Sequence, residues 1–222
     1  MKIKSLLLPT LFVTSSAFAV TPYVEGQLTY INIDDVDSKT YSGSVSGITY
    51  TGAKVEHDYD NDIAFGFEIG AKDFGIKGMR LGLSYTRAKF DLDSSDVSGT
   101  ITDGTTTISG TTNVKSSTFK SVGLDFDNTA KLYMANLYYD FDLNEKVKPF
   151  VGVGAGWADI ENIDGNEFTA SVSAGAKYYF DKQVYLGGKA SYTNINSPKD
   201  DLGLKYDDIE LYSATVMLGY EF

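Results

Sequence analysis

Most of this chain alternates between apolar residues and small or polar residues with a period of two, which is the period of a β-strand. The final stretch, "YSATVMLGYEF", shows the pattern well, with an apolar or aromatic residue at every second position from Tyr212 to Phe222. A helix would need apolar residues three and four positions apart. Eight stretches follow the period of two: Tyr23–Ile33, Ile63–Lys72, Met79–Phe90, Lys131–Phe141, Pro149–Ile160, Phe168–Phe180, Val184–Ile195 and Tyr212–Phe222. The sequence therefore predicts an all-β fold.

The length of these stretches indicates a membrane. A tilted strand needs ~9–11 residues to cross a bilayer, whereas strands of soluble domains usually have ~5–6 residues. The connections also alternate, because long segments at 34–61 and 93–130 are separated by short turns such as "FGIKG" and "DKQ". Short turns on one side and longer loops on the other are typical of outer-membrane barrels. We predict an eight-stranded antiparallel up-and-down transmembrane β-barrel with both chain ends in the periplasm.

The two faces of each strand allow two interpretations. In a soluble sandwich the apolar faces would pack against each other, whereas in a membrane barrel they would contact lipid and the polar faces would be enclosed. Aromatic residues lie near both ends of the apolar faces, as membrane boundaries favour. They are Tyr30, Phe65, Tyr85, Trp157, Phe168 and Tyr212 toward one end, and Tyr139, Phe141, Tyr178, Phe180, Tyr220 and Phe222 toward the other. The barrel interpretation is therefore favoured.

The polar faces carry charges of both signs between glycines. These predicted inward residues are Glu25, Glu68, Lys72, Arg80, Asp140, Lys177, Lys189 and Glu221. Because an unpaired buried charge is unfavourable, we expect ion pairs, and specifically a pair between Glu68 and Lys189 that acts as a plug or gate. An eight-stranded interior is only wide enough for side chains, which argues against an open pore.

The first nineteen residues read as a secretory signal peptide, with a basic start, an apolar stretch and "AFA" as the cleavage site. We therefore divide the chain into a signal peptide at 1–19 and a barrel domain at 20–222. Without Lys2 and Lys4, 17 basic residues remain against 30 acidic ones, a net charge of −13. So acidic a chain argues against nucleic acid as a partner. The chain has no cysteine, which excludes disulfides.

The first long connection holds the candidate polar sites. His57 is the one histidine of the chain, and we interpret it as a solvated loop residue. Asp58, Asp60 and Asp62 lie two apart and would hold Ca²⁺ only weakly, so an acidic solvated strand end is the favoured interpretation. No metal or other cofactor and no catalytic residue is predicted.

Both long connections are rich in Ser, Thr and Gly, with hairpin turns expected at Ser46-Gly47 and at Asp103-Gly104. One interpretation is that they extend the strands as ribbons whose free edges bind a partner. The alternative is a pair of mobile loops selected only for solubility.

The chain resembles the eight-stranded outer-membrane β-barrel superfamily, which includes the opacity-type proteins and the barrel domain of outer membrane protein A. The resemblance covers 20–222 and rests on the terminal Phe222, the aromatic Tyr220 two positions before it, and the Gly-alternating "KPFVGVGAGW". It implies that Val216, Leu218, Tyr220 and Phe222 form the signal by which the barrel assembly machinery recognises the last strand. It also implies location in the bacterial outer membrane. Because the sequence stops at the eighth predicted strand, we expect no peptidoglycan-binding domain like that of outer membrane protein A after the barrel.

Three functions follow as expectations. The leading one is a structural or surface-interaction barrel for adhesion, recognition or envelope integrity. Its partners would be outer-membrane lipid and lipopolysaccharide, and host or extracellular ligands. Divalent ions would bridge lipid phosphates to an acidic rim, which consists of Asp34, Asp35, Asp37, Asp58, Asp60, Asp62, Asp200, Asp201, Asp207 and Asp208. The alternative is a narrow porin-like channel for ions or small solutes. A lipid-modifying outer-membrane enzyme is the least favoured.

Overall fold

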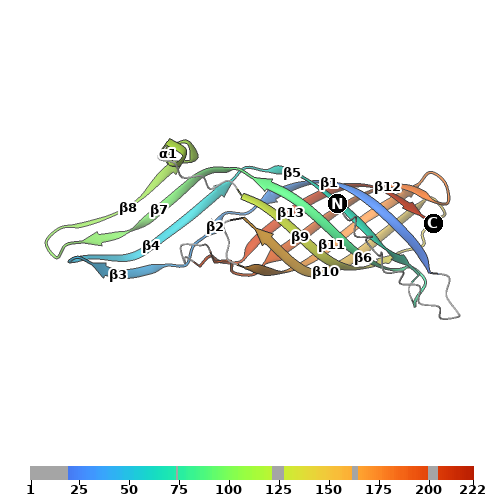
Figure 1. The fold of residues 1–222 in the computed structure, drawn as a ribbon, viewed down its shortest axis with the longest axis horizontal. Helices are drawn as coiled ribbons and strands as arrows, with labels where there is room; N and C mark the ends of the chain where they lie inside the picture. Colours follow the sequence, from blue (N-terminus) through green and yellow to red (C-terminus); the bar gives the residue numbers. More distant parts are fainter. Residues whose placement is uncertain (1–19, 74, 122–127, 162–164, 200–204) are drawn as a thin grey trace, which may run out of the picture.

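The computed structural model describes residues 20–73, 75–121, 128–161, 165–199 and 205–222 (Figure 1). The expected signal peptide at 1–19 lies outside the described residues. Eight antiparallel strands close into a barrel in the order β1-β13-β12-β11-β10-β9-β6-β5. Their bounds are β1 Thr21–Ile33, β5 Asp62–Lys72, β6 Met79–Phe90, β9 Asn128–Asp140, β10 Val147–Ile160, β11 Asn166–Tyr179, β12 Val184–Ile195 and β13 Ile209–Glu221. The predicted fold class is confirmed, and no predicted strand end differs from the structure by more than three residues.

The barrel closes where its first strand meets its last. β1 and β13 pair from Tyr23↔Glu221 to Ile33↔Leu211, and the backbone N–H of Phe222 donates to the carbonyl of Pro22 at 2.9 Å. Closure leaves none of these eight strands with a free edge, which is how a sheet satisfies its backbone groups in lipid.

Burial alternates along each strand with the polar side inward. Tyr23, Glu68 and Lys177 are at most 1% exposed, while the outward-facing Phe65 is 68% exposed and Leu218 is 58% exposed. No second sheet packs on the outer apolar face of the barrel within the described residues. The soluble sandwich is therefore wrong, and the enclosed polar face is confirmed.

Aromatic pairs mark the end of the barrel where β9, β11 and β13 finish. The same edge-to-face pair occurs three times, with ring centroids 5.1 Å apart for Tyr139 and Phe141, 5.5 Å for Tyr178 and Phe180, and 4.9 Å for Tyr220 and Phe222. This repetition on alternate strands produces one of the two predicted aromatic girdles.

A second sheet extends from the opposite end of the barrel (Figure 1). It consists of β2 Val36–Asp37, β3 Tyr41–Val45, β4 Ile48–Tyr59, β7 Leu92–Thr102 and β8 Thr107–Lys115, and the short helix α1 Ser116–Ser121 follows it. The strand order is β2-β4-β7-β8, with β3 also paired to β4. We call these five strands the projecting sheet. No helix in the described part of the chain is long and apolar enough to cross a membrane.

The two hairpin turns of the projecting sheet differ in length. Ser46 and Gly47 both have positive φ and join the paired residues Val45 and Ile48, as predicted for a two-residue turn. At the other turn, four residues separate Thr102 from Thr107. The expected two-residue turn at Asp103-Gly104 is therefore wrong, because the Asp103 carboxylate accepts the backbone N–H groups of residues 105 and 106 and widens the loop.

Candidate functional site

The barrel interior has three layers, and the charged one lies at the end that holds both termini of the barrel. Seven of the eight predicted inward charges gather there. We call them the ionic cluster: Glu25, Glu68, Lys72, Arg80, Asp140, Lys177 and Glu221.

Glu68 on β5 is the centre of the ionic cluster and is completely buried. Its carboxylate accepts hydrogen bonds from the hydroxyl of Tyr23 at 2.5 Å, the hydroxyl of Tyr138 at 2.8 Å and the amide of Asn136 at 2.9 Å. The guanidinium of Arg80 lies 3.5 Å away. This set of four donors compensates the burial of one negative charge.

Arg80 on β6 is held by rings as well as by carboxylates. Its Cζ lies 4.0 Å from the ring centroid of Tyr138, 5.1 Å from that of Tyr23 and 5.2 Å from that of Phe150. Its Nε lies 3.5 Å from Asp140 Oδ1. A planar guanidinium can contact ring faces and carboxylates together, which the ammonium of a lysine does less well.

The remaining ion pairs connect the cluster to the last strand. Lys177 on β11 contacts Asp140 at 2.6 Å and Glu221 at 3.6 Å, and Lys72 contacts Glu221 at 2.7 Å. The hydroxyl of Tyr179 donates to Glu221 at 2.5 Å. Four strands far apart in sequence are joined across the lumen in this way.

Inward glycines provide the room for these large side chains. A Cβ at Gly82 would lie 2.4 Å from both Glu68 Oε1 and the Tyr23 hydroxyl, and a Cβ at Gly219 would lie 2.1 Å from the Tyr185 ring. The small residues of the polar face are therefore a packing requirement of the ionic cluster.

The eighth inward charge, Lys189 on β12, lies elsewhere. Its Nζ is 5.9 Å from the ring centroid of Tyr138, and no carboxylate of the described residues contacts it. The predicted pair between Glu68 and Lys189 is therefore wrong, and the cation beside Glu68 is Arg80. The stagger of a barrel determines which residues of distant strands lie at the same height along the barrel axis. The alternation of residues along one strand gives no information about this stagger.

The middle layer is a cavity of about 80 Å³, which we call the hydroxyl chamber. Its polar lining comes from Gln27, Thr29, Ser84, Thr86, Asn136, Tyr138, Ser171, Ser173, Lys189, Ser191, Thr193, Ser213 and Thr215. Lys189 is the one charged residue among all of its lining residues.

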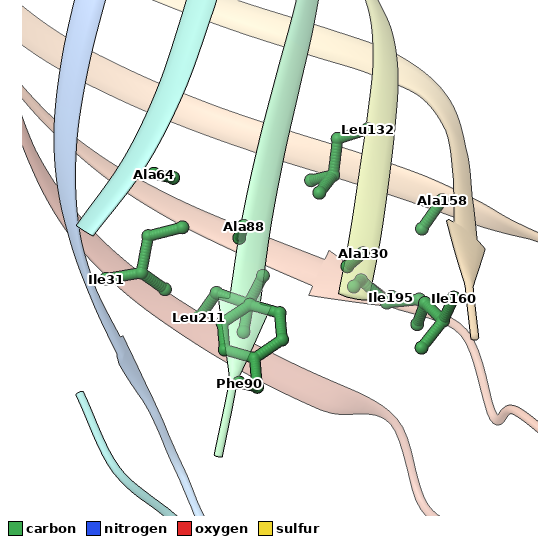
Figure 2. Packing of buried hydrophobic residues seen from close by; sticks show 10 residues of the cluster. All are labelled: Ile31, Ala64, Ala88, Phe90, Ala130, Leu132, Ala158, Ile160, Ile195 and Leu211. Carbon is green, nitrogen blue, oxygen red and sulfur yellow. The ribbon is translucent and has the colours of Figure 1, made fainter. Parts of the chain in front are cut away.

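The third layer, near the projecting sheet, is apolar. Figure 2 shows side chains from seven strands converging inside the barrel here. We call them the apolar collar: Ile31, Ala64, Ala88, Phe90, Ala130, Leu132, Ala158, Ile160, Ile195 and Leu211. This layer corrects the sequence interpretation, in which the whole interior is polar. The layer could have been predicted, because the inward-facing positions of most strands change from polar to apolar residues at this end.

The projecting sheet has one apolar face near its tip. Tyr50, Ile101 and Ile108 are directly paired across β4, β7 and β8, so their side chains share a face. Ile48 and its partner Val45 lie on the same face, because Ile48 is two positions from Tyr50. Ile101 is 54% exposed and Ile108 is 70% exposed.

The opposite face carries rows of hydroxyl groups. Ser44, Thr49, Thr102 and Thr107 form one row across four strands. Within it, Ser44 Oγ and Thr49 Oγ1 are 2.8 Å apart, and Thr107 Oγ1 donates to Thr102 Oγ1 at 3.1 Å. A second row consists of Thr51, Thr100 and Ser109. The tip of the projecting sheet is thus amphipathic, although both faces are outside the barrel.

Two strands of the projecting sheet have a free edge. β3 pairs only with β4, and β8 pairs only with β7, within the described part of the chain. Backbone groups along such edges are available to an added strand.

The base of the projecting sheet is tied to the segment before β13. Ser38 bridges to Tyr206, and the backbone N–H of Lys39 donates to the carbonyl of Lys205 at 2.7 Å. Lys39 and Asp207 also form an ion pair. These contacts fix the base of the sheet to the barrel.

His57 lies within this base and is buried, so the expectation of a solvated loop residue is wrong. Its Nδ1 is 2.7 Å from Ser95 Oγ, and its ring lies 5.8 Å from that of Tyr206. Ser95 is 1% exposed, so this His–Ser contact is closed to a substrate. The structure therefore gives His57 a packing role.

The candidate calcium ligands do not converge. Asp58 belongs to β4 and Asp62 begins β5, where its carboxylate accepts the backbone N–H of Ile63 at 2.6 Å. No group of three or more acidic or histidine side chains in the described residues is arranged to hold a metal ion. Burial, followed by repulsion from Asp35 and other nearby carboxylates, raises the pKa of Asp58.

The four residues of the expected assembly signal all lie on the outer side of β13. Val216 is 57% exposed, Leu218 is 58% exposed and Phe222 is 67% exposed, with Tyr220 in the same register. Recognition of this surface by an assembly machinery stays a prediction.

Comparison with known proteins agrees with this architecture. The model of the outer membrane protein beta-barrel domain family matches residues 5–222. Protein opa of Haemophilus influenzae is 32% identical over 100 residues, which cover 40% of this chain and 76% of that protein. The crystal structure of Neisserial surface protein A has a TM-score of 0.56 and 15% identity, covering 92% of this chain and 99% of the other. OprG from Pseudomonas aeruginosa has a TM-score of 0.49 and 14% identity, covering 92% and 97%.

Proposed function

Because this chain belongs to the outer membrane protein beta-barrel domain family, we propose that it is a bacterial outer-membrane barrel that contacts other surfaces through its projecting sheet. Its role would be adhesion, recognition or envelope integrity. The ionic cluster and the apolar collar would keep the lumen closed, so that the barrel serves as a rigid anchor. The barrel assembly machinery would fold it, and lipopolysaccharide in the outer leaflet of the membrane would surround it.

The observation that carries the proposal is the form of the projecting sheet. Exposed isoleucines on one side, hydroxyl rows on the other and two free strand edges are three separate means of contact. A sheet needed only for solubility has no reason to expose Ile48, Ile101 and Ile108 together on one face. One structural neighbour is named as a surface protein, Neisserial surface protein A, and this name is consistent with surface display.

Acidic residues at the base of the sheet would add a second type of contact. Asp35, Asp93 and Asp96 each lie close enough to Asp58 to raise its pKa by charge repulsion. Divalent cations shared with lipid phosphates would relieve this repulsion, which is the proposed link to envelope integrity.

The test compares the two faces of the sheet tip in proteoliposomes. One variant combines Tyr50→Ser, Ile101→Ser and Ile108→Ser, and a matched variant combines Thr49→Ala, Thr102→Ala and Thr107→Ala. Adhesion to epithelial cells and to immobilised matrix proteins is measured, while heat-dependent gel migration reports barrel folding. We expect the first variant to lose most adhesion with the barrel intact. Wild-type adhesion no higher than that of empty liposomes would disprove the proposal.

A narrow channel for ions or small solutes is the second candidate. The hydroxyl chamber favours it, because a polar cavity in mid-barrel is what a solute path requires. Both ends of the chamber are obstructed by buried side chains, and a conducting state would need both to move.

A further inference from the structure

We propose that the hydroxyl chamber binds one small inorganic anion, with Lys189 as its charged ligand. The ammonium group of Lys189 has no hydrogen-bonding or ion-pair partner within the described residues. Every other inward charge of the barrel contacts an opposite charge. A half-buried ammonium with three free N–H donors is an unusual group to leave without a partner.

The wall beside Lys189 supplies further donors. Ser173, Ser191 and Ser213 are directly paired across β11, β12 and β13, and Ser171 pairs with Thr193 one step further along. These five hydroxyls, like that of Thr86, have no hydrogen-bond partner among the described residues. Hydroxyl hydrogens rotate, so they can all turn toward an anion.

No carboxylate of the ionic cluster forms an ion pair with Lys189. Glu68 already accepts from Tyr23, Tyr138 and Asn136 and faces Arg80, and no acidic residue lines the chamber. The ionic cluster carries four carboxylates and three cations, and its surplus negative charge opposes an anion. Asn136 and Tyr138, which donate to Glu68, line the chamber and separate that carboxylate from it. The ammonium of Lys189 has no carboxylate beside it among the described residues that line the chamber.

The volume also limits the ligand. A cavity of about 80 Å³ has room for a phosphate-sized oxyanion or for a halide with a few waters, and excludes a sugar phosphate or a nucleotide. Several hydroxyl donors around one ammonium suit a tetrahedral oxyanion best, because its oxygens can each accept more than one hydrogen bond. The collar residues Leu132 and Leu211 line the outer side of the chamber, so exchange requires them to change rotamer.

Inorganic phosphate is the probe for a direct binding test. Purified folded protein in detergent is dialysed to equilibrium with labelled phosphate, and phosphorus NMR line widths report exchange. Lys189→Met keeps the length of the side chain and removes its charge. Lys182→Met, at an exposed position between β11 and β12, is the matched control. We expect about one phosphate per wild-type chain, an affinity reduced ~10-fold or more in Lys189→Met, and no change in Lys182→Met.

Two further measurements keep the proposal falsifiable. Lys189→Arg preserves the charge and should retain binding even if Lys189→Met folds poorly, and sodium chloride should compete if anions in general are accepted. The same binding in wild type and Lys189→Met, or no phosphate retained by any folded variant, would show that the chamber holds water alone. This test is independent of adhesion by the projecting sheet.

Discussion

At the scale of single residues, the fold depends on buried charges that lie against opposite charges and hydrogen-bonding groups. Glu68 has three hydrogen-bond donors and a guanidinium around it. In a barrel surrounded by lipid, the polar side chains face the lumen. A buried charge there needs a partner from within the barrel, because lipid supplies none.

The first prediction concerns this network. Glu68→Ala leaves Arg80 beside fewer carboxylates and removes the acceptor of Tyr23 and Tyr138, so we expect a loss of about 3–5 kcal/mol in the free energy of unfolding. Urea titration of the folded barrel, followed through the single tryptophan, Trp157, measures it. Asp91→Ala breaks the exposed Lys89–Asp91 contact and should change stability by at most about 1 kcal/mol. Equal losses in the two variants would contradict the assigned interior.

The second prediction concerns pH. Because the pKa of Asp58 is raised in the folded protein, folding favours its protonated form. That contribution is complete below the ordinary pKa of 3.8 and is lost as pH rises through the raised value. Asp58→Asn should therefore slow proteolysis of the projecting sheet at neutral pH and have little effect near pH 3.5. Slower cleavage of the variant only at acidic pH would reverse the sign and contradict the assignment.

At the scale of elements, the sequence predicts the bounds of the strands well, but it does not predict the height of a residue along the barrel axis. Met79–Phe90 and Val184–Ile195 were predicted to the residue, because alternation ends where a turn begins. The Glu68–Lys189 pair failed, because the register between neighbouring strands and the resulting stagger are not encoded in the pattern of any one strand. Local pattern thus gives the face of a residue but not its height in the barrel.

The projecting sheet shows a second limit. Its strand β4 carries register shifts between Thr51 and Lys54 and between Asp58 and Tyr59, each of which interrupts the period of two. The extended ribbons with free edges that the sequence suggests as one interpretation are present, but the positions of these shifts are not readable from the sequence pattern. The burial of His57 could not be predicted, because it depends on Tyr206, which lies far along the chain.

The third prediction tests the lipid-facing side of an element. Val153 lies near the middle of β10 and is 55% exposed on the outer face. Val153→Arg should reduce stability by about 2–4 kcal/mol in a bilayer, because the charge enters hydrocarbon. Val45→Arg, at 64% exposure in the projecting sheet, should have almost no effect. Unfolding titrations in lipid vesicles compare them, and similar losses would place Val45 and Val153 in the same medium.

Neighbouring positions on one strand are less suitable for such a comparison. Leu218 faces outward and Met217 faces the lumen, so Met217→Arg would be the inward counterpart of Leu218→Arg. Met217 is 1% exposed and packs in a cluster with Tyr138, Phe150 and Tyr185. An arginine there would have to overfill the lumen, so the inward variant is not a mild control.

At the scale of the whole molecule, the interior has an apolar layer and a charged layer with a cavity between them, which we expect to act as two barriers in series. The apolar collar would exclude ions because they would lose their hydration there, and the ionic cluster would obstruct the other end with large side chains that are held by hydrogen bonds. These barriers are chemically different and are built from different parts of the strands. We therefore expect either one alone to keep the lumen closed.

The last prediction follows from that arrangement and is measured as single-channel current in planar bilayers. Leu132→Ala with Leu211→Ala opens the collar, and Tyr138→Ala with Tyr185→Ala removes bulk from the ionic cluster while keeping its charges. Two obstructions in series mean that each double variant alone stays near the wild-type current, whereas the combined variant shows stepwise conductance. If the collar variant alone conducts, the ionic cluster is not a barrier, and the channel becomes the better account of the lumen. If even the combined variant stays silent while folded, the chamber is a closed compartment and surface contact remains the one role that the architecture supports.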